Sequence, residues 1–148
     1  MTVKQLTAAD TPLAASIAAL ERECFAEPWS EAAVLESLKN PLYTFLAALS
    51  GESIHGYVGA FTVAGEMQIT NVAVTATARR QGVGNALIHA LITEAKRLSA
   101  ESITLEVRAS NTAAQRLYEK HGFTATGVRK SFYSHPTEDG ILMTLDLP

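Results

Sequence analysis

The chain has 148 residues, 47% of them apolar and 18% charged, and this size and balance predict a single globular domain spanning residues 1–148. Twelve basic and fifteen acidic side chains leave a formal net charge of −3, which argues against direct nucleic-acid binding. The sequence contains no membrane-spanning apolar run and no signal-peptide core, and Cys24 has no cysteine partner. We therefore expect a soluble cytoplasmic protein without membrane contact or intrachain disulfide.

The first half of the chain is predicted to contain a strand, two helices and three further strands. Val3–Leu6 is the first candidate strand, and Thr11 is a candidate N-cap for a helix that reaches about Cys24. Ser30 is the candidate cap of a second, shorter helix. The β-rich runs that follow are separated by short turns, which predicts an antiparallel meander of strands at Tyr43–Leu49, Ile54–Val63 and Glu66–Val74.

The second half alternates helices and strands. Apolar residues recur on one helical face from Val83 to Leu98, and a strand follows at Ser102–Val107. Because a helix connects it to Glu66–Val74, these two strands should run parallel. A helix over Asn111–His121 and strands at Phe123–Lys130 and Ile141–Leu147 complete the chain. The order predicts an α+β fold in three layers, with a mixed, mostly antiparallel sheet of about seven strands flanked by about four helices.

The segment before the long helix carries a glycine loop, Arg79-Arg80-Gln81-Gly82-Val83-Gly84. The first backbone N–H groups of a helix lack partners, and the helix dipole adds partial positive charge beside them. The loop therefore predicts an anion site, most readily for phosphate. Neither the Rossmann pattern G-x-G-x-x-G nor the Walker pattern G-x-x-x-x-G-K-[ST] is present. The alternative interpretation is an ordinary turn with two solvated arginines.

Glu106 and Tyr118 are candidates for proton transfer. Glu106 lies on the polar face of its strand, next to the strand that leads into the glycine loop. A carboxylate in a partly apolar cleft has a raised pKa and is a better base near neutral pH, although a solvated glutamate is the alternative. Tyr118 is either a core aromatic or a proton donor, and Asn111 either starts a helix or contacts a ligand. The four histidines lack the spacing of a metal site.

The glycine loop fits the pattern [Q/R]-x-x-G-x-[G/A] and, together with the order of elements, resembles the GNAT N-acetyltransferases over nearly the whole chain. The stretches L-E-V-R-A-S-N at 105–111, L-Y-E-K-H-G-F at 117–123, E-P-W-S at 27–30, N-V-A-V at 71–74 and R-K-S-F-Y at 129–133 resemble the members that acetylate the N-terminal alanine of a small-subunit ribosomal protein. The resemblance implies acetyl-CoA as co-substrate, no metal, and the N-terminal segment of a protein, expected to be ribosomal, as partner.

The resemblance also implies roles for individual residues. Glu106 would accept the proton of the acceptor amine through water, and Tyr118 would protonate the departing thiolate. Residues implied to contact acetyl-CoA are Val72, Ala73, Val74, Arg79, Arg80, Gln81, Gly82, Val83, Gly84, Asn85 and Asn111. Residues implied to contact the acceptor are Trp29, Phe132 and Tyr133.

The sequence departs from the family pattern before the glycine loop, where Thr75-Ala76-Thr77-Ala78 replaces D-P-x-[YW]. Asn85 replaces a basic or small residue, and Phe132 replaces a tyrosine. Two alternative functions stay open: a GNAT enzyme that acetylates a small amine or amino acid, and a non-catalytic acetyl-CoA-binding module. Retention of Glu106 and Tyr118 favours an enzyme, and the matches at Trp29 and Phe132-Tyr133 favour a peptide acceptor.

Overall fold

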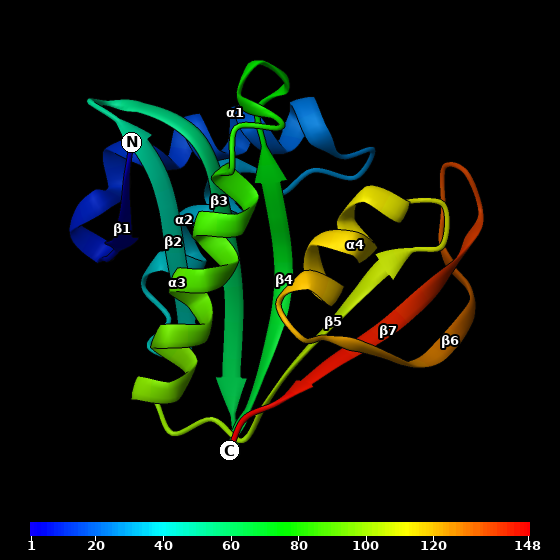
Figure 1. Cartoon of the computed structure of the whole chain (residues 1–148). Coiled ribbons are helices and arrows are strands. Elements are labelled where there is room, and N and C mark those ends of the chain that lie inside the picture. The colour runs from blue at the N-terminus through cyan, green and yellow to red at the C-terminus, as the bar shows by residue number, and fades with distance from the viewer.

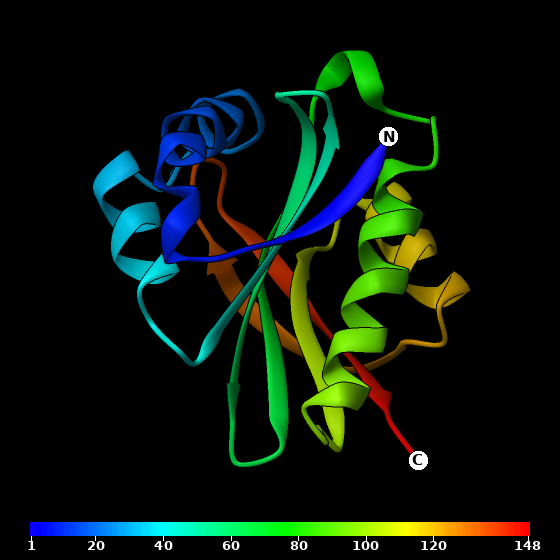
Figure 2. The ribbon, with the colours of Figure 1, turned by 90° about the vertical axis from the view of Figure 1, so that its left-hand side faces the viewer.

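In the computed structural model, which describes all 148 residues, a seven-stranded sheet lies between two layers of helices (Figures 1 and 2). The strands are β1 (Thr2–Leu6), β2 (Tyr43–Ser50), β3 (Ser53–Val63), β4 (Glu66–Val74), β5 (Ser102–Arg108), β6 (Thr124–Tyr133) and β7 (Glu138–Asp146). The helices are α1 (Ala14–Cys24), α2 (Glu31–Leu38), α3 (Val83–Arg97) and α4 (Thr112–Lys120), with short 3₁₀ helices η1 (Ala8–Leu13) and η2 (Ala76–Ala78). The strand order is β1-β2-β3-β4-β5-β7-β6, and the one parallel pair is β4 with β5. The predicted mixed sheet and its parallel pair are confirmed.

The predicted N-cap at Thr11 is wrong. The Thr7 hydroxyl accepts the Ala9 N–H (3.2 Å), while the Asp10 carboxylate accepts the Thr7 N–H (2.7 Å). This reciprocal capping box satisfies the free amides at the start of η1, so the helical turn begins before the position that the sequence indicated.

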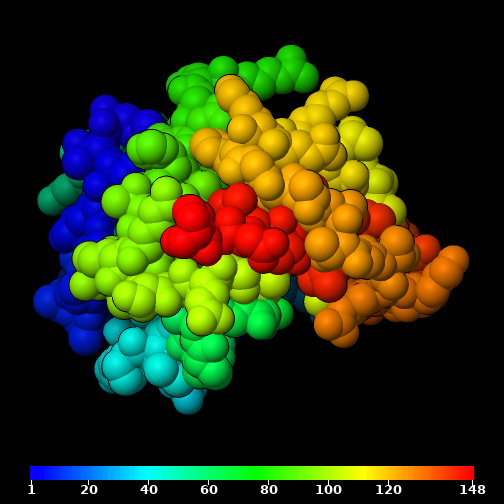
Figure 3. All heavy atoms as spheres, turned by 60° about the horizontal axis from the view of Figure 1, so that its bottom comes forward, coloured from blue at the N-terminus to red at the C-terminus, as the bar shows by residue number.

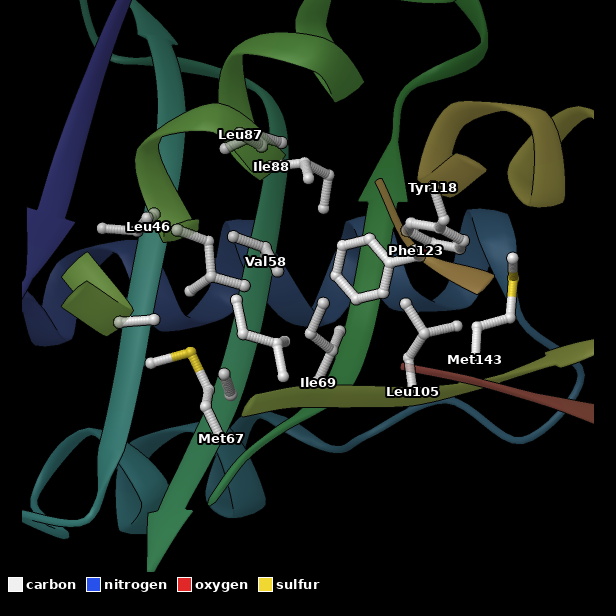
Figure 4. Packing of buried hydrophobic residues seen from close by; sticks show 14 of the residues in the cluster. Leu46, Val58, Met67, Ile69, Leu87, Ile88, Leu105, Tyr118, Phe123 and Met143 are labelled. Carbon is white, nitrogen blue, oxygen red and sulfur yellow. The ribbon is translucent and has the colours of Figure 1, made fainter. Parts of the chain in front are cut away.

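Two apolar clusters fix the helices on opposite faces of the sheet. The helix α3 buries Leu87, Ile88 and Leu91 completely against one face, and each such side chain contributes about 1.5–3 kcal/mol to the free energy of unfolding. Figure 4 shows other members of this cluster, among them Tyr118 of α4 and the residues Leu46, Val58, Met67, Ile69, Leu105, Phe123 and Met143. The helices α1 and α2 cover the other face through a second cluster that includes Ile17, Val34, Phe45, Tyr57 and Ala73.

The sheet opens between β4 and β5. Their paired register ends at Gln68 and Thr104, and beyond these residues the two strands diverge (Figure 1). We call this region, where the facing edges of β4 and β5 are unpaired, the β4–β5 gap. At the closed end, the Glu101 N–H donates to Gly65 and the Leu147 N–H to Glu101, and the C-terminal residues lie between the end of α3 and β6 (Figure 3). The gap therefore opens only towards the loop that follows β4.

We expect Gly56→Ala to lower the free energy of unfolding by about 1–3 kcal/mol. An added Cβ would lie 2.8 Å from the Ala73 carbonyl oxygen and 3.0 Å from Val83, so β3, β4 and α3 would have to move apart. Urea denaturation measures the change. The matched control is Gly127→Ala, where the nearest atom lies 3.7 Å away on Leu142 and we expect a change under about 0.5 kcal/mol. Equal effects of the two substitutions would contradict the close approach at Gly56.

Candidate active site

The loop from Arg79 to Asn85 presents a run of unpaired backbone N–H groups. None of these amides donates a hydrogen bond within the protein, because the first bond into α3 runs from the Ala86 N–H to the Gly82 oxygen (3.0 Å). Arg80 (φ 65°) and Gly82 (φ 80°) both adopt the left-handed backbone conformation, which turns successive N–H groups into a concavity for anions. The geometry of the loop fits the phosphate site that the sequence predicts.

The two arginines of this loop differ in what they contact. The Arg79 Nε donates to the Val74 carbonyl oxygen (3.3 Å), and its terminal nitrogen lies 3.7 Å from the Cys24 sulfur. Arg80 is exposed and has no side-chain partner. Arg80 is therefore the cation that remains free to meet an anion at the loop.

The strand β4 also directs backbone groups to the gap, of which the Val74 carbonyl oxygen already accepts hydrogen bonds from the Arg79 Nε and the Cys24 thiol. The Thr75 N–H donates to the His55 oxygen of β3 (2.9 Å). Since successive residues of an antiparallel strand point their backbone groups to opposite edges, Val72 and Val74 direct theirs away from β3 and towards the gap. Their side chains pack on the α3 cluster. An extended ligand could therefore pair with this edge as an added strand would.

Three residues that the sequence assigns to the cofactor also have structural roles. An added Cβ on Gly84 would lie 3.1 Å from Leu117, so this glycine lets α3 approach α4 closely. The Asn85 side-chain oxygen lies 3.1 Å from the His121 Nε2, and Asn111 caps α4 through its side-chain oxygen (3.1 Å). Contacts of these residues with a ligand stay predictions.

Glu106 lies at the gap with one oxygen paired and one free. Its side chain projects from the face of β5 opposite Leu105, which is buried in the α3 cluster, and is 10% exposed. The Arg129 Nε on β6 lies 2.9 Å from Oε1, whereas Oε2 is closed off from solvent and has no hydrogen-bond partner. The sequence predicted a partly apolar cleft at this position and did not identify the guanidinium.

Tyr118 approaches the same region from α4. Its ring is 6% exposed and packs against Phe123 with a centroid distance of 5.8 Å, and its hydroxyl has no hydrogen-bond partner in the protein. Burial, with a smaller contribution from Tyr133, raises the pKa of Tyr118 well above its usual value. Burial and then the charge of Glu106 also raise the pKa of Tyr133. Tyr133 thus interacts electrostatically with both Tyr118 and Glu106.

Arg108 fastens the turn between β6 and β7 beside this group. Its guanidinium donates to the carbonyl oxygens of Ser134 (2.8 Å) and Pro136 (2.9 Å), pairs with Glu138 (3.2 Å) and lies 4.6 Å from the centroid of the Tyr133 ring. These contacts extend the hairpin: β6 continues to Tyr133 and β7 begins at Glu138. The predicted end of the first strand at Lys130 was therefore too early, and the predicted start of the second at Ile141 was too late.

The residues predicted to contact the acceptor lie on two segments beside the gap. Trp29 packs edge-on against Tyr43 (6.1 Å) and Phe45 (6.5 Å), whereas Phe132 is 49% exposed on β6. The loop before α2 and the β6–β7 turn meet at Glu27 and His135, whose facing atoms are 3.1 Å apart. The two segments are thus neighbours in space, and Tyr133, at the end of β6, is partly buried.

The sequence matches the Acetyltransferase (GNAT) family over residues 14–123, which include the glycine loop, Glu106 and Tyr118. The chain belongs to this family. It is 34% identical over 150 aligned residues to ribosomal protein bS18-alanine N-acetyltransferase of Escherichia coli (strain K12), covering 99% of this chain and 97% of that protein. The crystal structure of the ribosomal-protein-S18-alanine N-acetyltransferase from Escherichia coli matches with a TM-score of 0.86 at 33% identity, over 98% of this chain and 92% of that one. The GNAT fold predicted from the sequence is therefore confirmed.

The same fold serves a GNAT enzyme with a different acceptor. Aminoglycoside 6'-acetyltransferase type Ii matches with a TM-score of 0.86 at 21% identity, over 100% of this chain and 99% of that one, a likeness that shows the shared fold alone. The fold by itself therefore leaves the acceptor open. No three His, Cys, Asp or Glu side chains come together as metal ligands. None of the helices combines the length and apolar character that a membrane crossing requires.

We expect the Glu138 carboxylate to stabilise the folded protein at neutral pH and to lose this effect in acid. Its hydrogen bond from Ser110, supported by the charge of Arg108, lowers the pKa of Glu138 below its usual 4.5. A lowered folded-state pKa gives stability that is present above pH 4.5 and lost as the pH falls through the folded value. Glu138→Gln should lower the urea midpoint at pH 7, and the difference from wild type should narrow below pH 4.5. Glu119→Gln, at an exposed glutamate without a partner, should show no such pH-dependent difference.

Proposed function

We propose that the chain is an acetyl-CoA-dependent N-acetyltransferase that acetylates the α-amine of the N-terminal alanine of a ribosomal protein, as its Escherichia coli relative is named to do. The observation that carries the proposal is the pair Glu106 and Tyr118 beside the β4–β5 gap. Glu106 offers an unpartnered carboxylate oxygen and Tyr118 an unpartnered hydroxyl. Transfer of an acyl group from a thiol to an amine uses one group that accepts the proton of the amine and another that protonates the thiolate.

The unpaired backbone groups of the chain fit acetyl-CoA. The N–H groups from Arg80 to Asn85, with the free Arg80 side chain, would bind the pyrophosphate at the N-terminus of α3. The edge of β4 at Val72–Val74 would pair with the pantetheine arm, and Asn111 would contact the cofactor from the start of α4. Acetyl-CoA supplies the acetyl group as an activated thioester. The protein fixes its position at the gap, between the two proton-transfer groups.

Glu106 would prepare the acceptor for attack. An α-amine has a pKa of about 7.7–8.0 and is mostly protonated at neutral pH, so it must lose a proton before it becomes a nucleophile. The free Oε2 would take that proton, directly or through a water molecule. Arg129 holds the other oxygen at 2.9 Å and thereby orients the carboxylate. The N–H groups of β4 at the gap would stabilise the negative charge that develops on the carbonyl oxygen.

Tyr118 would protonate the departing thiolate. Because burial raises its pKa, the phenol stays protonated throughout the neutral range and remains available as a donor. The same low-polarity surroundings disfavour the charged thiolate and raise the pKa of the leaving thiol. The pKa values of the Tyr118 phenol and of the leaving thiol are therefore both raised, so transfer of the proton from the phenol to the thiolate remains feasible. No covalent enzyme intermediate is needed, so the reaction does not require Cys24 as a nucleophile.

Two observations favour a peptide over a small amine as acceptor. The chain shares 34% identity with the bS18-alanine enzyme over nearly its whole length, and it keeps Trp29 and Tyr133 on the segments beside the gap. The retained pair Glu106 and Tyr118 favours catalysis over a role as a non-catalytic acetyl-CoA-binding module. The 21% identity to the aminoglycoside enzyme supports only the common fold.

We expect Tyr118→Phe to lower kcat by about 10²–10⁴-fold, the usual contribution of a positioned proton donor. The affinity for acetyl-CoA, measured by calorimetry, should change less than about twofold, because the ring and its packing remain. Tyr43→Phe removes a hydroxyl from an aromatic group that packs on Trp29, away from Tyr118, and should leave kcat unchanged. Normal turnover by Tyr118→Phe would show that another group protonates the thiolate.

The acceptor is identified by acetyl-CoA consumption with mass detection of products. We expect an Ala-initiated basic peptide to be acetylated at its α-amine, and a panel of polyamines, amino acids and aminoglycosides to be left unmodified. The same peptide with a blocked α-amine and free lysines is the control, and it should not react. Turnover of small amines alone would retain the family and discard the peptide acceptor. No turnover with any acceptor would favour the non-catalytic alternative.

A further inference from the structure

A buried carboxylate without an ion-pair partner lies behind β4. Glu21 of α1 is 0% exposed. It accepts hydrogen bonds from the Tyr57 hydroxyl (2.6 Å), the Trp29 backbone N–H (2.9 Å) and the Asn71 side-chain amide (3.1 Å). These donors come from β3, from the loop before α2 and from β4. A carboxylate persists in such a place only when hydrogen bonds replace its hydration, so Glu21 holds three segments together beside the gap.

Glu21 fixes the orientation of the Asn71 side chain. Carboxylate oxygens accept hydrogen bonds, so the NH₂ group of the amide must face Glu21, and it lies 3.1 and 3.3 Å from the two oxygens. The amide oxygen Oδ1 is directed away from Glu21, is closed off from solvent and accepts no hydrogen bond. A buried acceptor without a donor costs about 1–3 kcal/mol. A ligand that donates a hydrogen bond to the Asn71 oxygen would remove this cost, since no group of the protein does so.

Asn71 lies level with Glu106 across the gap. The strands β4 and β5 pair as far as Gln68 and Thr104. A bulge inserts Thr70 as an extra residue of β4, because Ile69 and Asn71 face successive residues of β3. From the last pair, Gln68 with Thr104, Glu106 is two positions further along β5. Asn71 is three positions further along β4, one of which is the bulged Thr70, so the two residues are at the same level.

The side chains of Asn71 and Glu106 also share a face of the sheet. Ala73, two residues after Asn71, belongs to the cluster under α1 and α2, whereas Leu105, next to Glu106, belongs to the opposite cluster. Three buried side-chain oxygens in the chain lack a partner, and two of them are Asn71 Oδ1 and Glu106 Oε2. The third, Thr62 Oγ1, lies near the end of β3 away from the gap. The free oxygens of Asn71 and Glu106 thus flank the place where the proposed acceptor would react.

We propose that Asn71 binds the acceptor and that Glu21 is its positioning residue. Asn71 Oδ1 accepts an N–H of the acceptor, either from the α-amine itself or from the first peptide bond, while Glu106 takes the proton that the amine loses. The inference rests on the proposed function, because it needs an amine acceptor at the gap. The inferred acceptor is a primary amine with an N–H group that can donate to Asn71 of β4, as the N-terminus of a peptide has.

The test is the effect of Asn71→Leu, which keeps the side-chain volume and removes the amide, on steady-state kinetics. We expect the KM for the Ala-initiated peptide to rise about tenfold, in line with loss of one hydrogen bond to the acceptor. The KM for acetyl-CoA should stay within about twofold of wild type. Thr62→Val is the matched control, because it removes the third unpartnered oxygen, and it should change neither KM. An unchanged KM for the peptide in folded Asn71→Leu would overturn the proposal.

Two further variants separate binding from folding. Asn71→Ser, which leaves a small hydroxyl beside Glu21, gives the same test if leucine prevents folding. Glu21→Gln removes the constraint that keeps the NH₂ group of Asn71 inward, so the KM for the peptide should rise while that for acetyl-CoA does not. A loss of stability in Glu21→Gln with no change in the KM for the peptide would leave Glu21 a purely structural role and overturn its positioning role.

A peptide methylated at the nitrogen of its second residue identifies the donor. If the first peptide N–H binds Asn71, methylation raises the KM of wild type but not further that of Asn71→Leu. If the α-amine is the donor, the effects of methylation and of Asn71→Leu on the KM for the peptide are independent and multiply. Turnover of the peptide by wild type tests the proposed function separately. If wild type acetylates only a small amine, the KM for that amine in Asn71→Leu decides the inference, and no turnover with any acceptor overturns both proposals.

Discussion

The structure depends on an interruption of hydrogen bonding in the middle of its sheet. Beyond Gln68 and Thr104 the edges of β4 and β5 face each other without pairing. Unpaired strand edges in a sheet interior are unfavourable unless water or a ligand meets their N–H and C=O groups. Three features in other parts of the fold accompany the separation of β4 and β5. The bulge at Thr70 bends β4, the close approach at Gly56 ties β3 and β4 to α3, and the Arg108 contacts draw β6 and β7 towards the end of β5.

The two clusters give the opening two different sides. On the α3 side, the glycine loop leads into α3 with free N–H groups, and the cluster that buries Leu87 also buries Tyr118. On the α1 side, the polar groups Asn71 and Glu106 each have a partner through one atom and none through the other. Each side chain is thus fixed in orientation with one oxygen left free. Both oxygens are closed off from solvent, so neighbouring atoms must move for a ligand to reach them, but the amide and the carboxylate are already oriented, as electrostatic assistance in enzymes requires.

Much of the fold was predictable because its elements have strong local patterns. The apolar stripe of α3 and the glycine-bounded strands of the meander each specify their own structure within a few residues. The error at Thr11 arose where two local capping patterns compete, and the Thr7–Asp10 capping box prevailed. The pairing of Glu106 with Arg129 and the contacts of Arg108 with the β6–β7 turn join residues more than 20 positions apart. Sequence periodicity contains no information on such contacts, so the candidate base was predicted and its partner was not.

The same contrast explains why the family is easier to identify than the acceptor. Apart from Asn111, the residues proposed to bind acetyl-CoA lie in one continuous stretch, from Val72 to Asn85. The proposed acceptor side combines the loop before α2, Asn71 and the β6–β7 turn, which are joined through Glu21 and through the contact of Glu27 with His135. On this proposal, substitutions in these segments would change the acceptor without altering the residues that bind the cofactor. The aminoglycoside acetyltransferase shares this fold at 21% identity, as expected if acceptor residues vary independently of the fold.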